Sequence, residues 1–159
     1  MGWNTIDLLG PDITKVYTTL DYALGTRCMA RNTTTGYVGE FIFMTGVAST
    51  AAASWVAFNY DDHSTTLLVD GVIGPVGVAM AATVADTYGW YQIRGKASGK
   101  VAAGVNENVG LYASATAGTA GGTSAGKSEI IGACSAAASG AGGATEVEIN
   151  YPVCGLSAG

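Results

Sequence analysis

Residues 74–95 read GPVGVAMAATVADTYGWYQIRG and predict two apolar strands joined by a turn. Residues 76–80 alternate Val, Val and Met with Gly and Ala, which is the pattern of a strand with two distinct faces. Residues 90–94 are aromatic and end in a charge. Residues 86–89 contain Asp, Thr and Gly, which form turns because Asp bonds its own backbone and Gly tolerates positive φ. The stretch therefore predicts a buried hairpin in a protein whose strands pack on each other.

Two further stretches in the first half of the chain also predict strands. Residues 37–44 read YVGEFIFM, with both phenylalanines on one face and Ile42 and Met44 on the other. A strand that is apolar on both faces is covered on both sides. Residues 55–60, with the sequence WVAFNY, predict another strand, since aromatic and β-branched residues favour a pleated surface.

The segment that begins at Glu146 alternates apolar and polar residues near the end of the chain. The period of two predicts a strand with Val147, Ile149 and Tyr151 facing inward and the two glutamates facing outward. We expect Pro152 to end this strand, because proline has no N–H to donate to a neighbouring strand.

A weak internal repeat supports a fold built from hairpins. Each copy is a strand of small residues, a connection rich in Ala, Ser, Thr or Gly, and an alternating strand. Ala-rich residues 78–86 and 133–139 have the composition of short helices, but glycine on both sides argues against them. The sequence therefore predicts an all-β fold, a compact β-sandwich or small β-barrel with little helix. The small-residue strands of the three copies begin at Gly46, Gly77 and Gly132, and the alternating strands at Trp55, Trp90 and Glu146.

The predicted domain organisation is an extended N-terminal arm at residues 1–20 and a single β domain at residues 21–159. The arm lacks a clear helical or strand period over most of its length. Its apolar side chains are candidate partner contacts; the alternative is that the arm folds back on its own domain. These candidates are Trp3, Ile6, Leu8 and Leu9.

The composition excludes some classes of partner. Charged residues make up 12% of the chain, against about 25% in typical soluble domains. So few charges protect a lone globule poorly against association, and we expect a homo-oligomer or a larger lattice to cover much of the surface. The net charge of −5, with seven scattered basic residues, argues against direct nucleic-acid binding. No apolar run approaches the 20 or so residues that span a bilayer, so we expect no membrane insertion.

Three cysteines, Cys28, Cys134 and Cys154, include no C-x-x-C pair. This number and spacing support neither a disulfide framework nor a zinc site, so we expect reduced thiols in a protein made in a reducing cytoplasm.

One motif matches the phosphate-binding pattern G-x-x-x-x-G-K-[ST], with Gly121, Gly126, Lys127 and Ser128 at its defined positions. A true P-loop follows a buried strand and opens a helix whose amides hold phosphate. Here residues 114–120 are small and polar, and another glycine follows the motif within four positions. We interpret the match as a decoy produced by a Gly-, Ser- and Thr-rich composition, with no bound cofactor.

A P-loop enzyme also needs an acidic residue that holds magnesium at the end of an apolar strand. Residues 67–70, Leu-Leu-Val-Asp, have this character but lie upstream of the motif. This order along the chain is a further argument against a phosphate site.

Other candidate catalytic or ligand-binding residues have simpler explanations. His63 follows two aspartates and reads as a solvated turn, because no further metal ligand stands at a known spacing. Glu146 and Glu148 share one face of a strand, which fits its solvent side better than a glycosidase pair. Trp3, Trp55 and Trp90 are interpreted as residues that pack in the core or at a subunit interface rather than as a sugar platform. The sequence thus predicts neither an enzyme nor a metal site.

Several short segments resemble a group of small capsid-associated proteins of tailed bacteriophages. The resemblance spans roughly residues 20–151 and is carried by common residues. The segments are Ala23-Leu24-Gly25-Thr26-Arg27, Gly36-Tyr37, Phe41-Ile42-Phe43, Gly46-Val47-Ala48, Ile73-Gly74, Val76-Gly77-Val78-Ala79, Gly89-Trp90-Tyr91-Gln92-Ile93-Arg94-Gly95 and Ile131-Gly132-Ala133.

The resemblance implies a virion structural protein, a head decoration or cement protein with no catalytic residues. Its expected partners are the major capsid protein, whose lattice it would clamp from the capsid exterior, and further copies of itself, with a homotrimer favoured over a dimer. It implies no position on the capsid for residues 1–20. A tail or fibre module that recognises a host surface is the main alternative, and a P-loop nucleotide hydrolase is a weaker one.

Overall fold

The computed structural model describes residues 2–6 and 10–155, which form β-strands and connecting loops with no helix. This confirms the all-β prediction. The Ala-rich ranges 78–86 and 133–139 form no helix either. The strands are β1 (Trp3–Thr5), β2 (Arg27–Asn32), β3 (Val38–Thr45), β4 (Trp55–Phe58), β5 (Thr65–Leu67), β6 (Gly74–Ala79), β7 (Tyr88–Val101), β8 (Gly110–Ala113), β9 (Ala120–Gly121), β10 (Glu129–Ser135) and β11 (Gly143–Cys154).

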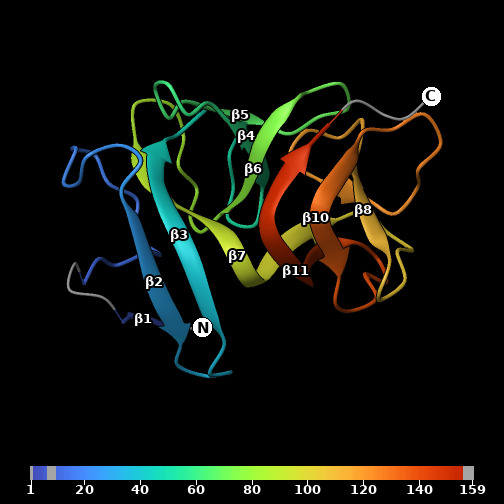
Figure 1. Ribbon diagram of the computed structural model, residues 1–159, viewed down its shortest axis with the longest axis horizontal. Helices are drawn as coiled ribbons and strands as arrows, with labels where there is room; N and C mark the ends of the chain where they lie inside the picture. The colour runs from blue at the N-terminus through green and yellow to red at the C-terminus, as the bar shows by residue number, and fades with distance from the viewer. Residues whose placement is uncertain (1, 7–9, 156–159) are drawn as a thin grey trace.

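The described strands belong to one sheet in the order β1-β2-β3-β7-β9-β8-β10-β11-β6-β4-β5, with additional pairings of β7 to β11 and of β7 to β6. The pairings therefore run from β7 through β9, β8, β10 and β11 back to β7. This ring is linked between β7 and β9 by a single residue pair, Val101 with Ala120. Figure 1 shows β2, β3, β7, β11 and β10 following one another across the molecule.

Strand β7 is the centre of the sheet, and its partners change along its length. Its first half pairs with β3 through residues 88–94, and its second half pairs with β11 through residues 94–101. The strand bends at Gly95, whose φ is +100°. The side-chain amide of Gln92 holds the bend, because its Nε2 donates to the carbonyl oxygens of Arg94 at 3.1 Å and Lys96 at 3.0 Å. The hairpin predicted at residues 74–95 is present, since Val78 pairs with Gln92.

Strand β3 is buried on both faces, as its sequence predicts. Phe41 and Phe43 pack into a cluster with Trp90 and the N-terminal segment. Ile42 and Met44 pack on the opposite face, in a cluster with residues of β4, β6 and β7. A third cluster fills the interior of the ring. It also includes residues of β4 and β6, which pack against the ring strands.

Strand β11 departs from the prediction near its end. Tyr151 is exposed rather than inward, and Pro152 lies within the strand, which continues to Cys154. The cause is a bulge. Ile131 pairs with Val153 and Ala133 pairs with Ile149, so Gly132 of β10 lies opposite three residues of β11, 150–152. Tyr151 and Gly132 both have positive φ there, 45° and 86°. A proline is tolerated in a bulge because no ladder hydrogen bond is lost.

The repeat prediction holds for two copies and is wrong for the first. The copies at Gly77 and Gly132 form the antiparallel pairs β6–β7 and β10–β11. Residues 46–48 form no strand, and β4 pairs instead with β5 and β6. The backbone N–H of Gly46 donates to Thr87 O at 2.7 Å, so this segment joins the loop before β7.

The described part of the N-terminal segment lies against its own sheet. Strand β1 pairs with β2, and Ile13 and Tyr17 are buried in the cluster around Phe43. This matches the alternative in which the segment folds back. Across residues 2–6 and 10–155, no helix is long and apolar enough to cross a membrane.

Candidate functional site

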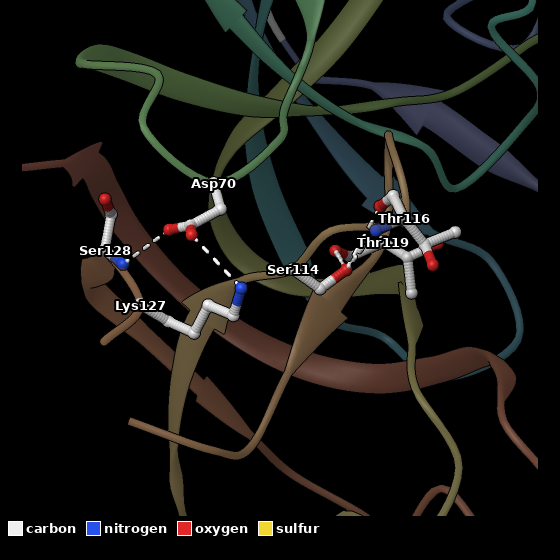
Figure 2. A network of polar contacts seen from close by, with 6 residues as sticks. All are labelled: Asp70, Ser114, Thr116, Thr119, Lys127 and Ser128. Carbon is white, nitrogen blue, oxygen red and sulfur yellow. Dashed lines mark hydrogen bonds and ion pairs between the residues drawn. The ribbon is translucent and has the colours of Figure 1, made fainter. Parts of the chain in front are cut away.

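The P-loop-like motif meets Asp70 in space, although the two are 57 residues apart in sequence. The Nζ of Lys127 lies 3.1 Å from Asp70 Oδ2. The backbone N–H of Ser128 donates to Asp70 Oδ1 at 3.0 Å. Figure 2 shows the carboxylate between these two donors.

The surrounding backbone differs from that of a phosphate site. Gly121 ends the short strand β9, and Gly126 adopts a φ of +65° in a turn. Ser128 is buried, and strand β10 begins at the next residue, where a P-loop would open a helix. The two donors that a phosphate would use, a lysine ammonium and a backbone amide, bind the Asp70 carboxylate instead. The arrangement is an internal clamp between the loop before β10 and the loop after β5.

A second set of hydrogen bonds holds the turn before β9 and connects it to Asp70. Ser114 Oγ donates to the carbonyl oxygen of Thr119 at 2.8 Å and accepts from the backbone N–H of Thr116 at 3.1 Å (Figure 2). The backbone N–H of Asp70 donates to Ser114 O at 3.0 Å. Polar side chains here satisfy backbone groups of a glycine-rich region, which is a structural role.

The clamp predicts a pH dependence of stability. The hydrogen bond from Ser128, followed by that from Lys127, lowers the pKa of Asp70 below its ordinary value. A lowered folded-state pKa stabilises the fold above the unfolded pKa of about 3.9, and this contribution is lost as the pH falls through the folded value. We therefore expect Asp70→Asn to unfold at a lower temperature than the wild type at pH 7, and the difference to shrink below about pH 4. Thermal melts of both proteins from pH 7 to pH 2.5 measure it. A difference that persists unchanged at pH 2.5 would contradict the clamp.

The other candidate acids are engaged in surface contacts. Glu146 Oε1 lies 2.6 Å from Lys96 Nζ, and Glu148 Oε1 lies 3.9 Å from the same atom. The hydrogen bond with Glu146 raises the pKa of Lys96. One lysine between two glutamates is an ordinary surface ion-pair group. His63 lies in the turn between β4 and β5 with its ring against Gly25. Within the described ranges, no three His, Cys, Asp or Glu residues are grouped so that they could hold a metal ion.

The tryptophans of β4 and β7 are core residues. Trp55 and Trp90 are fully buried, and Trp55 Nε1 donates to Lys100 O at 2.9 Å. None of the three cysteines forms a disulfide bond with another described residue. Cys28 and Cys154 are buried, and burial raises the pKa of the Cys154 thiol.

The candidate contact residues of the N-terminal arm are partly placed by the structure. Trp3 is half-buried and meets Phe41 edge-on, with ring centroids 5.2 Å apart. Ile6 is exposed. Leu8 and Leu9 lie outside the described residues, and a partner contact at all four positions stays a prediction.

The structure reveals an exposed apolar row that the sequence reasoning missed. Ile131 of β10 lies opposite Val153 of β11, and Val153 lies opposite Pro75 of β6. Ile131 and Val153 are 59% and 43% exposed, and Ile73, just before β6, is also exposed. Directly paired residues share one face of a sheet, so these side chains form a continuous outer row. The alternation of Ile130 and Ile131 was the available signal, because one of two adjacent strand residues points outward.

No protein-family model matches the chain, and neither a curated protein nor a solved structure is significantly similar to it.

Proposed function

We propose that this protein is a virion structural protein that binds the exterior of a bacteriophage capsid and stabilises the head. The resemblance described above supplies the class, and the exposed apolar row of Ile131, Val153 and Pro75 carries the argument for a covered surface. Exposed apolar patches on soluble domains mark surfaces that contact other proteins. In this chain the row occurs on a surface with unusually few charges.

The polar groups of the chain also support a structural role. The P-loop-like lysine binds Asp70, and the paired glutamates bind one lysine. Both arrangements connect strands and loops of the fold. The resemblance further implies a homo-oligomer, for which we favour a trimer, and synthesis in the reducing cytoplasm of a host cell fits the absence of disulfide bonds among the described cysteines.

The test uses the purified full chain and heads assembled without it by the virus that encodes it. We expect the protein to cosediment with these heads and to raise the temperature at which they break. If the protein binds the intact lattice and not the broken one, a free protein concentration of 100 times the Kd stabilises each site by about 2.7 kcal/mol. Matched heads incubated with an unrelated protein of similar size are the control. Absence of cosedimentation with heads would refute the proposal. Binding to tails in place of heads would also refute it and would favour the tail or fibre alternative.

A further inference from the structure

A groove runs along the outer face of the sheet, beside the apolar row. It has a volume of about 760 Å³ and lies between β2 and β3 on one side and β10 and β11 on the other. Its floor is a row of directly paired residues on four adjacent strands: Met29, Glu40, Arg94 and Asn150. Gly132, which follows Ile131, lines its far wall. The apolar row and the groove are therefore parts of one continuous face.

Basic residues are concentrated on this face. Strand β2 alternates, so that Arg27, Met29 and Arg31 point outward while Cys28 and Ala30 point into the core. With Arg94 and Lys96 of β7, the groove face carries four of the seven basic residues of the chain. On strands β2, β3, β7 and β11 the acidic residues of this face are Glu40, Glu146 and Glu148, so the formal charge there is +1 in a chain of −5. The rest of the chain is correspondingly acidic. This asymmetry orients the molecule so that the groove face approaches a negatively charged surface first.

Two of these arginines have unused hydrogen-bonding capacity. Arg27 lies 3.4 Å from Glu40, but Arg31 and Arg94 form no ion pair with any described residue. The guanidinium of Arg94 lies 6.0 Å from the ring centroid of Tyr151. A guanidinium carries five N–H donors, so contact with Tyr151 leaves several of them available for a carboxylate.

The bulge in β11 places Tyr151 at the edge of this groove. Its φ of 45° is unusual for a bulky residue, and its hydroxyl donates to Glu40 Oε2 across the groove. Tyrosine and arginine are also the residues that most often dominate the binding energy of protein interfaces. The face thus combines an apolar row with arginines and a presented tyrosine, which is the composition of a protein-binding surface.

We infer that the groove face is the surface through which this protein contacts its capsid partner, and that the partner presents acidic side chains to Arg31 and Arg94. The inference rests on the proposed function and adds to it the face and the chemistry of the contact.

The experiment compares Arg31→Glu, Arg94→Glu and the double variant with Lys15→Glu in cosedimentation with undecorated heads. Each single substitution changes the charge by the same amount. Lys15 is exposed on the segment that covers the opposite face of β2 and β3, where Ile13 and Tyr17 are buried. Circular dichroism and thermal melts establish that each variant folds. Arg31 is exposed near the edge of the sheet, so Arg31→Glu alone keeps the test valid if Arg94→Glu disturbs β7.

We expect the double substitution to raise the Kd for heads by about tenfold or more. Lys15→Glu should leave the Kd within about threefold of the wild-type value. Wild-type binding is expected to weaken as salt rises from 50 to 200 mM, and the double variant to lose most of this dependence. If the wild type binds heads and all variants bind equally well, the proposed function stands and the groove face is the wrong surface. If the wild type does not bind heads, both proposals fail. If sedimentation velocity shows that the double variant loses self-association while keeping head binding, the face is a contact between copies and the inference is wrong.

Discussion

Replacing Trp90 with alanine is expected to destabilise the folded protein by about 3–5 kcal/mol, the range measured for large aromatic residues in protein cores. Trp90 is fully buried in the cluster between β3, β7 and the N-terminal segment. Its ring centroid lies 5.3 Å from that of Phe43 and 5.4 Å from that of Tyr22. Truncation removes these aromatic contacts and leaves a cavity that a sheet paired on both sides cannot close. For a domain of this size the melting temperature should fall by about 2–4 °C per kcal/mol.

Trp3→Ala is the matched control for this prediction, because Trp3 is the same residue type in the same cluster but only half-buried. We expect a clearly smaller loss of stability, since less of its surface leaves water on folding. Urea unfolding of both variants gives the comparison. Equal midpoints for the wild type and Trp90→Ala would place the Trp90 side chain outside the core and would contradict the packing described here.

Replacing Gly95 with alanine is expected to be of similar severity, although it adds only one methyl group. Gly95 has a φ of +100°, which side chains rarely adopt. A Cβ there would lie 2.5 Å from the carbonyl oxygen of Val38 and 3.1 Å from the Cα of Gly39. Both atoms belong to the backbone of β3, so relief requires that two paired strands separate. Backbone strain of about 1–3 kcal/mol and overpacking of about 1–3 kcal/mol together predict a loss of about 2–6 kcal/mol.

Gly104→Ala separates these two contributions. Gly104 also has a positive φ, +76°, but a Cβ there would meet no atom within 4 Å. This variant should lose only the backbone contribution, about 1–2 kcal/mol. Denaturant unfolding of both variants measures the difference. Equal losses at the two positions would show that β3 and β7 approach each other less closely than the structure indicates.

The local periodicity of the sequence predicted strands wherever side-chain burial alternates regularly. A period of two predicted that Ile42 and Phe43 are buried on opposite faces, because pleating forces this alternation. The same period predicted that Val147 and Ile149 point inward. The extension of β7 to Val101 did not follow, since residues 95–101 are mostly Gly, Lys, Ala and Ser. These residues become a strand because they pair with β11, and the pairing partner lies about 50 positions away.

Glycine and proline gave the least reliable predictions, because their effect depends on neighbouring strands. Pro152 was expected to end β11, yet the strand continues because the bulge opposite Gly132 needs no N–H at that position. The same bulge turns Tyr151 outward, where its hydroxyl reaches Glu40 of the groove.

By itself, the sequence determined that the fold is all-β, that the strand at residues 37–44 is buried on both faces, and that the P-loop-like pattern does not open a helix. Each of these depends on residues close together in the chain. The tertiary structure decided the ring of strands, the clamp between Asp70 and Lys127, and the gathering of Arg31, Arg94 and Ile131 on one face. These features depend on the register between distant strands, and a shift of one residue would turn every side chain of a strand to its other face. For the stretch at residues 74–95, the hairpin was a local property, whereas the bend at Gly95 and the exposed position of Arg94 came from pairing with β3 and β11.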